Sequence, residues 1–226
     1  MAPVQRRRGG GGKRALLVGG AAGVALVLVA ALVLVARVTT RPASPPPHSD
    51  LYRPVSPLPN AVPVTVFFDF QCIYCARFAR EHEQRLRREY LPKGVVDLRL
   101  RHFPILGAES WLAAQAAECA GEQGRFWEYY DLLWRRHGGV NRGVFTARNL
   151  KAWGREIGLD GPRFDACLDT GRGLVKVEED FREGRRLGVD ATPTLIIDGQ
   201  MIRGLVPWED FRRILDEALR RRGLSL

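Results

Sequence analysis

The stretch Val62–Cys75, with the sequence VPVTVFFDFQCIYC, is an apolar run that ends in two cysteines separated by two residues. Its β-branched and aromatic residues predict a strand, and the residues from Ala76 onward have helical character. Cys72 would then lie at the first turn of a helix, where unpaired backbone N–H groups and the positive end of the helix dipole favour the thiolate. We expect an exposed Cys72 with a pKa below the free value of ~8.5. A more buried Cys75 would attack a mixed disulfide on Cys72, so the stretch predicts a dithiol–disulfide exchange site.

The charge of the chain is concentrated at its beginning. Residues 1–14 carry five of the ten net positive charges and residues 37–62 carry two more, which leaves three for the rest of the 226 residues. The later arginines alternate with glutamates on expected helices, which is typical of a solvated surface. The distribution therefore excludes nucleic acid as an expected partner.

Residues 15–36 contain no charged side chain and are long enough to span a ~30 Å hydrocarbon core. We expect a single transmembrane signal anchor over residues 15–38, embedded in the lipid bilayer; a cleaved signal peptide is the alternative. The basic tail 1–14 would then be cytoplasmic, with the rest of the chain extracytoplasmic. The Pro-rich residues 39–60 read as an extended linker.

The remaining residues, 61–226, predict one α/β domain. The order is strand, helix and strand, then a helical stretch at about 106–187, then two strands and a helix. The Asp198-Gly199 pair predicts a hairpin turn between the last two strands. The expected strands are Pro63–Phe70, Val95–Phe103, Thr194–Ile197 and Met201–Ile202. The expected helices are Ile73–Tyr90, Glu109–Gly121, Phe126–Arg136, Thr146–Ile157, Gly161–Thr170, Leu174–Leu187 and Pro207–Arg222.

Four motifs in this order resemble the DsbA-like thiol:disulfide oxidoreductases. They are FDFQCIYC (68–75), QGRFWEYY (123–130), FDACL (164–168) and GVDATPT (188–194). The resemblance covers about residues 60–222 and implies a thioredoxin-like fold with an inserted all-helical subdomain. It implies catalytic roles for Cys72 and Cys75, and a cis Pro193 that holds Thr192 beside them. The backbone of Thr192 would pair with an extended substrate, whereas an ordinary trans proline at a strand start is the alternative.

Two positions depart from the family pattern. Ile73 and Tyr74 separate the cysteines, where relatives often have proline first, so the redox potential is not transferable. Val66 occupies a position that is acidic in many relatives. A proton would then reach Cys75 through water or another carboxylate, although we expect nearby Asp69 to act mainly as a local cap.

The other two cysteines, Cys119 and Cys167, are expected in helices of the insertion. If Cys72 pairs with Cys75, they form the remaining disulfide, and relatives have cysteines at matching places. The alternative is two buried free thiols. We expect no metal, because the histidines lack ligand-like spacing to the cysteines; His82 is expected at the surface and His102 at a strand end.

The resemblance implies an enzyme that oxidises cysteine pairs of exported proteins and carries no cofactor. A membrane quinone-linked protein of the DsbB or VKOR type would reoxidise it. A disulfide reductase or isomerase of the same fold is one alternative, since Ile73-Tyr74 does not fix the direction. The other is a non-catalytic module that binds peptides or metal in the groove between Cys72 and Pro193.

Overall fold

The computed structural model describes residues 57–226. The expected basic tail 1–14, the signal anchor 15–38 and nearly all of the linker 39–60 lie outside the described residues. Among the residues from 57 onward, no helix combines the length and the apolar character needed to cross a bilayer.

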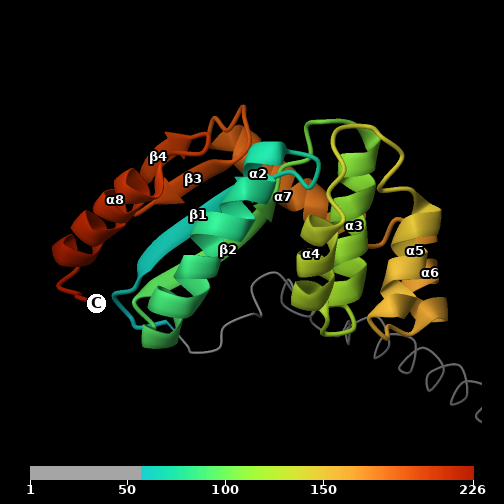
Figure 1. The fold of residues 1–226 in the computed structure, drawn as a ribbon, viewed down its shortest axis with the longest axis horizontal. Coiled ribbons are helices and arrows are strands. Elements are labelled where there is room, and N and C mark those ends of the chain that lie inside the picture. Colours follow the sequence, from blue (N-terminus) through green and yellow to red (C-terminus); the bar gives the residue numbers. More distant parts are fainter. Residues whose placement is uncertain (1–56) are drawn as a thin grey trace, which may run out of the picture. The chain divides into compact units, whose positions relative to one another are not determined.

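Four strands form one sheet in the order β2-β1-β3-β4 (Figure 1). The central strand β1 (Val62–Phe68) runs parallel to β2 (Val96–His102) and antiparallel to β3 (Thr194–Ile197), which pairs antiparallel with β4 (Gln200–Arg203). Five of the seven β1 residues are buried, as expected for a strand covered on both faces. The strands were expected correctly, with ends that differ by one or two residues.

The register of β1 places the cysteine stretch beside the start of β3. Phe67 pairs with Thr194, so Pro193 lies just beyond the end of β1, where the chain continues to Cys72. Segments 120 residues apart in sequence therefore meet at one end of the sheet.

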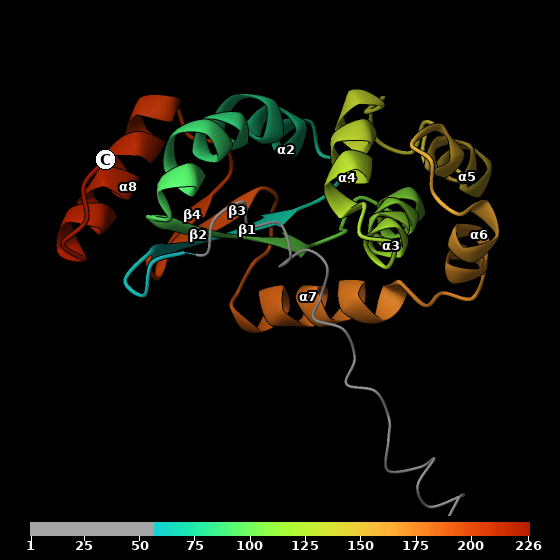
Figure 2. The same ribbon diagram turned by 90° about the horizontal axis from the view of Figure 1, so that it is seen from below.

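Helices cover both faces of the sheet (Figure 2). One face carries α2 (Ile73–Phe78) and α8 (Trp208–Arg221), and the other carries α7 (Leu174–Arg186). On the α7 face, Gly184 allows close packing, because a Cβ there would lie 2.7 Å from the ring of Phe103. The helices on the two faces of the sheet thus cover β1 from both sides.

The helix after Cys72 is not the uniform α-helix expected over Ile73–Tyr90. Beyond α2 it continues as two π-helical segments, Ala79–Glu83 and Leu86–Tyr90, and ends in a 3₁₀ turn, Leu91–Lys93. A π turn holds one residue more than an α turn, so it rotates the following side chains around the axis. Apolar spacing alone does not specify that change.

The helical insertion lies beyond one end of the sheet (Figure 1). It contains α3 (Ala108–Gly121), α4 (Phe126–Arg135), α5 (Ala147–Glu156) and α6 (Gly161–Asp169). A disulfide joins Cys119 of α3 to Cys167 of α6, with Cα atoms 5.7 Å apart. The mixed α/β thioredoxin-like fold with a helical insertion is confirmed.

Candidate active site

Cys72 and Cys75 lie at the junction between β1 and α2. Cys72 is the N-cap residue of α2 with extended backbone (φ −76°, ψ 119°), and its Sγ accepts a hydrogen bond from the Cys75 backbone N–H at 3.4 Å. Both cysteines are free thiols, and only 6% of Cys72 and 1% of Cys75 is exposed. The expectation of an openly exposed Cys72 was therefore wrong. Its sulfur lies at the floor of a groove formed by segments distant in sequence.

The two thiols differ strongly in acidity. The pKa of Cys72 falls from its ordinary value of 9.0 to about 6. The largest cause is a hydrogen bond from the Cys75 thiol; burial opposes it, and the Thr192 side chain and the backbone amides of residues 74 and 75 lower the pKa further. Burial raises the pKa of Cys75 well above its ordinary value. The helix amides that sequence reasoning emphasised contribute, but the neighbouring thiol contributes more.

The Thr192–Pro193 peptide bond is cis, as the resemblance implied. It turns the Thr192 carbonyl toward the site, where it accepts a hydrogen bond from Cys72 Sγ at 3.2 Å. The next carbonyl, that of Pro193, is occupied by the Gly204 N–H at 2.7 Å. Thr192 therefore presents its backbone at the sulfur while Pro193 is tied to the sheet.

Asp69 caps the loop between β1 and α2. Its Oδ1 accepts from the N–H of Gln71 at 2.8 Å, and its Oδ2 accepts from the N–H groups of Ile105 and Leu106 at 2.8 and 2.9 Å. The structure thus shows the capping contacts expected of Asp69. Val66 is buried and has no group that could carry a proton.

Gln71 holds the loop before Cys72 against the insertion. Its fully buried side chain donates to Ser110 Oγ at 2.8 Å and accepts from the N–H of Asn141 at 2.5 Å. Sequence reasoning assigned no role to Gln71. The available signal was an amide side chain directly before a reactive cysteine in an otherwise apolar stretch.

A groove of about 740 Å³ opens above Cys72. Exposed apolar side chains line it: Ile73 is 51% and Tyr74 54% exposed, and Ile105 and Val140 are also exposed. His137 and Thr192 also line it. Contiguous exposed apolar side chains commonly mark a binding surface. Ile73 and Tyr74 were expected at the site, whereas Ile105, His137 and Val140 were missed because only the fold brings their loops here.

The two histidines weighed at the sequence level are both buried. His82 was expected at the surface, but its ring stacks on Phe78 and its Nε2 lies 2.9 Å from the Val206 carbonyl oxygen. His102 ends β2 as expected and contacts Glu118 at 2.9 Å. Within residues 57–226, no three His, Cys, Asp or Glu side chains are grouped so that they could hold a metal ion.

Comparison with known proteins agrees with this geometry. The family model described as Thioredoxin matches residues 59–217. Because that match covers more than half of the 226 residues, the chain belongs to the thioredoxin family. Within it, the chain resembles proteins of the DsbA and BdbD type. BdbD from Bacillus subtilis superposes with a TM-score of 0.67 at 21% identity, covering 74% of this chain and 93% of that one.

Two further relatives differ in how much of their length this chain covers. The probable disulfide bond formation protein D of Bacillus cereus is 26% identical over 164 residues, which cover 71% of this chain and 75% of the relative. A Na(+)/H(+) antiporter NhaA 1 from Salinispora arenicola is 33% identical over 165 residues, covering 69% of this chain but 24% of the antiporter. The chain thus spans about a quarter of such antiporters, and their transport activity is not carried over to it.

Proposed function

We propose that this protein is an extracytoplasmic thiol:disulfide oxidoreductase that oxidises cysteine pairs of exported proteins. The observation that carries the proposal is the difference in pKa between the thiols of Cys72 and Cys75. Cys72 has a pKa of about 6 beside a cis-proline and an apolar groove, while burial raises the pKa of Cys75. A low thiol pKa makes Cys72 a good leaving group and favours its reduced state, which makes the disulfide form an oxidant.

The reaction begins with a disulfide between Cys72 and Cys75. A substrate thiolate attacks Sγ of Cys72, the bond to Cys75 breaks, and Cys75 leaves with the electron pair and takes up a proton. The second substrate thiolate then attacks the substrate sulfur of the mixed disulfide and releases Cys72 as a thiolate. The substrate loses two electrons and two protons, and the two cysteines gain the electrons.

The low pKa of Cys72 supports the second step, because a thiolate stable at neutral pH leaves readily. The Thr192 carbonyl, 3.2 Å from Cys72 Sγ, would accept a backbone N–H of the extended substrate. Ile73 and Tyr74 would contact apolar residues beside the substrate cysteine. These assignments give roles to every residue expected at the site.

Cys72 and Cys75 must be reoxidised after each cycle. A membrane quinone-linked protein of the DsbB or VKOR type would take the two electrons. The uncharged residues 15–36 of the expected anchor 15–38 support a location at the cell membrane as a single-pass protein, with the basic tail inside and the catalytic domain outside.

Equilibration of the full-length chain in detergent with glutathione buffers tests the direction of the reaction. We expect a reduction potential near ~−120 mV, the range of strong disulfide donors. A potential near ~−270 mV would assign the protein to the reductases. Failure of Cys72 and Cys75 to form any disulfide would leave only a peptide-binding role.

A further inference from the structure

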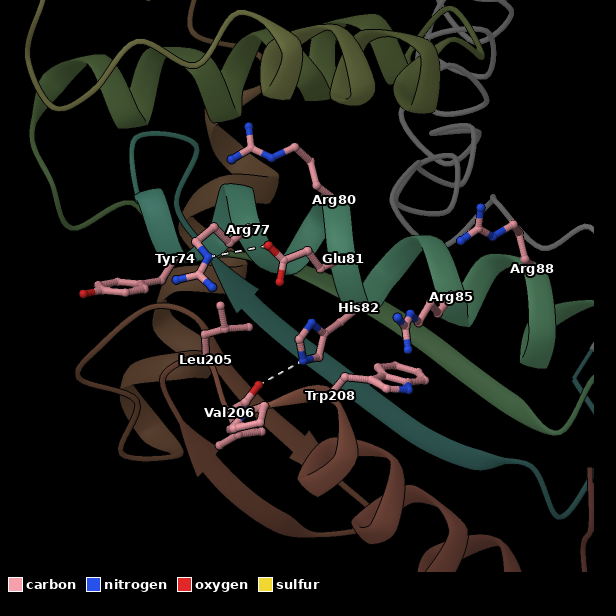
Figure 3. A pocket seen from close by; sticks show the side chains of 11 residues that line it. Tyr74, Arg77, Arg80, Glu81, His82, Arg85, Arg88, Leu205, Val206 and Trp208 are labelled. Carbon is pink, nitrogen blue, oxygen red and sulfur yellow. Dashed lines mark hydrogen bonds and ion pairs between the residues drawn. The ribbon is translucent and has the colours of Figure 1, made fainter.

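A second groove runs along the helix that begins at Cys72 (Figure 3). Its volume is about 660 Å³. One wall is the helix from Tyr74 to Arg88, and the other is the segment Leu205–Trp208, which leads from β4 into α8. The Nε2 of His82 bonds the Val206 carbonyl oxygen at 2.9 Å across the groove floor, which fixes the separation of the walls.

The groove is cationic. Its helical wall carries Arg77, Arg80, Arg85 and Arg88, all exposed, against a single carboxylate, Glu81. Figure 3 shows the side chains of Arg80 and Arg88 pointing away from Leu205–Trp208, so the groove charge comes mainly from Arg77 and Arg85. Among the described residues, only Arg77 pairs with an acid here, at 3.6 Å from Glu81, and both side chains are about half exposed. Such an exposed pair is weak and exchanges easily for another carboxylate.

Arg85 is already oriented for an anion. Its guanidinium carbon lies 4.7 Å from the centroid of the Trp208 ring. Figure 3 shows Arg77 and Arg85 on the side of the helix that faces Trp208. Stacking on the ring restrains the guanidinium plane and leaves its N–H groups available for a carboxylate.

The cationic groove and the active-site groove are neighbours, because Tyr74, which is 54% exposed, lines both. A helix rises ~1.5 Å per residue, so Arg77 and Arg85 lie about 8 and 20 Å along the axis from Cys72. An extended peptide advances ~3.3 Å per residue and would reach these arginines about two to six residues from its reacting cysteine.

We propose that the cationic groove binds an acidic segment of the polypeptide substrate, about two to six residues from the cysteine that reacts with Cys72. This inference rests on the proposed function. A concave groove lined by Tyr74, two residues from the reactive Cys72, fits an extended chain better than the flat surface of a bilayer. Attraction between the arginines and carboxylates would accelerate encounter and set the direction of the bound chain.

The test uses the full-length chain in detergent, oxidised and freed of oxidant. Its substrates are three reduced two-cysteine peptides that carry three glutamates before the first cysteine, three glutamates after the second, or glutamines at all these positions. We expect one glutamate peptide to be oxidised with a second-order rate constant roughly tenfold above that of the glutamine peptide at low salt, and the ratio to approach one in 0.5 M NaCl.

The variant Arg77→Glu/Arg85→Glu should lower this ratio to one or below. The matched control is Arg163→Glu/Arg186→Glu, which makes the same charge change at exposed sites on α6 and α7 and should keep the ratio near tenfold. Because the readout is a ratio within each variant, a general loss of activity does not imitate the effect. Thermal melting confirms that each variant is folded.

A ratio of one in the unaltered protein, with the glutamine peptide still oxidised, would overturn this inference and leave the proposed function standing. Oxidation of none of the peptides would overturn both. If phosphatidylglycerol in the micelles slowed oxidation of all three peptides equally, and Arg77→Glu/Arg85→Glu removed that slowing, the arginines would be assigned to a lipid surface and the proposal contradicted.

Discussion

The chain contains two cysteine pairs of similar burial and opposite character. Cys119 and Cys167 are each 1% exposed and form a disulfide, whereas Cys72 and Cys75 are almost as buried and are free thiols. The difference lies in what surrounds the sulfurs. A Cβ on Gly173 would lie 3.1 Å from Cys119 Sγ, so α7 begins directly against that pair.

Cys72 instead begins a helix at the floor of an open groove. Its sulfur receives hydrogen bonds that favour the thiolate, and exposed Ile73 and Tyr74 stand beside it. Burial therefore does not distinguish a structural cysteine from a reactive one. Position in the helix, hydrogen bonds to the sulfur and a path for a partner thiol distinguish them.

The largest expected effect is the loss of activity on removing the Cys72 sulfur. Cys72→Ala leaves no sulfur for the substrate thiolate to attack, so oxidation of a two-cysteine peptide should fall by roughly 1000-fold or more. The control, Cys119→Ala/Cys167→Ala, should retain most activity at a temperature where it stays folded. Equal losses in the two proteins would show that the comparison of the pairs is wrong.

The second prediction concerns the other pair, Cys119 and Cys167, and its readout is stability. The disulfide between Cys119 and Cys167 spans 48 residues, and in the chain-entropy model such a loop stabilises the fold by about 4 kcal/mol. Cys119→Ala/Cys167→Ala should lower the free energy of unfolding in urea by about that amount. A loss below ~1 kcal/mol would mean that packing of α3 on α6 holds the insertion without the bond.

The third prediction concerns pH. In the reduced protein, the alkylation rate of Cys72 should rise with a midpoint near pH 6. Because the thiol of Cys75 is the largest cause of the low pKa, Cys75→Ala should move the midpoint upward toward the ordinary value of 9.0. A midpoint that stays near 6 would assign the effect to the helix amides and Thr192.

The same shift makes the reduced fold more stable as pH rises. The folded pKa of about 6 lies below the ordinary value of 9.0, so between these values the unfolded chain binds more protons at Cys72. The stabilisation is fully present above pH 9 and is lost as the pH falls through 6. Urea denaturation of reduced Cys119→Ala/Cys167→Ala, compared with its Cys72→Ala derivative, measures this contribution together with the effect of Cys72 on the pKa of Cys75.

Much of the fold was predictable because local signals agreed with one another. Apolar runs, Gly and Pro breaks and the Asp198-Gly199 turn fixed elements whose ends differ from the structure by only one or two residues. The cysteine helix differs more, since it contains π-helical segments, and the first of them carries Glu83, whose Oε2 accepts from the Tyr130 hydroxyl at 2.6 Å. No spacing rule encodes a partner 47 residues away.

The residues of the site that lie within the cysteine motif were predictable, whereas those that the fold brings in from distant loops were not. The residues between and around Cys72 and Cys75 could be named from the motif. Ile105 and Val140 could not, because isolated apolar residues in loops carry no signal of which groove they will line. His82 was misplaced for a similar reason: its burial depends on Trp208 and Phe211, more than 120 residues later.

The smallest predicted effect tests the link between the two cysteine pairs. Gln71 precedes Cys72, and Ser110, which it contacts at 2.8 Å, lies on α3, the helix that carries Cys119.

Gln71→Leu leaves Ser110 and the Asn141 N–H without this partner, which should cost ~1–3 kcal/mol of stability in urea. It should also loosen the groove wall at Val140, so KM for an apolar peptide should rise several-fold while the pKa of Cys72 stays near 6. The matched control is Gln84→Leu, at a half-buried position on the helix that follows Cys72, outside the active-site groove. If Gln71→Leu lowers stability but leaves KM unchanged, Gln71 only joins the insertion to the sheet domain. If it raises KM and leaves the pKa unchanged, the insertion shapes substrate binding while the acidity of Cys72 is set within its own helix turn.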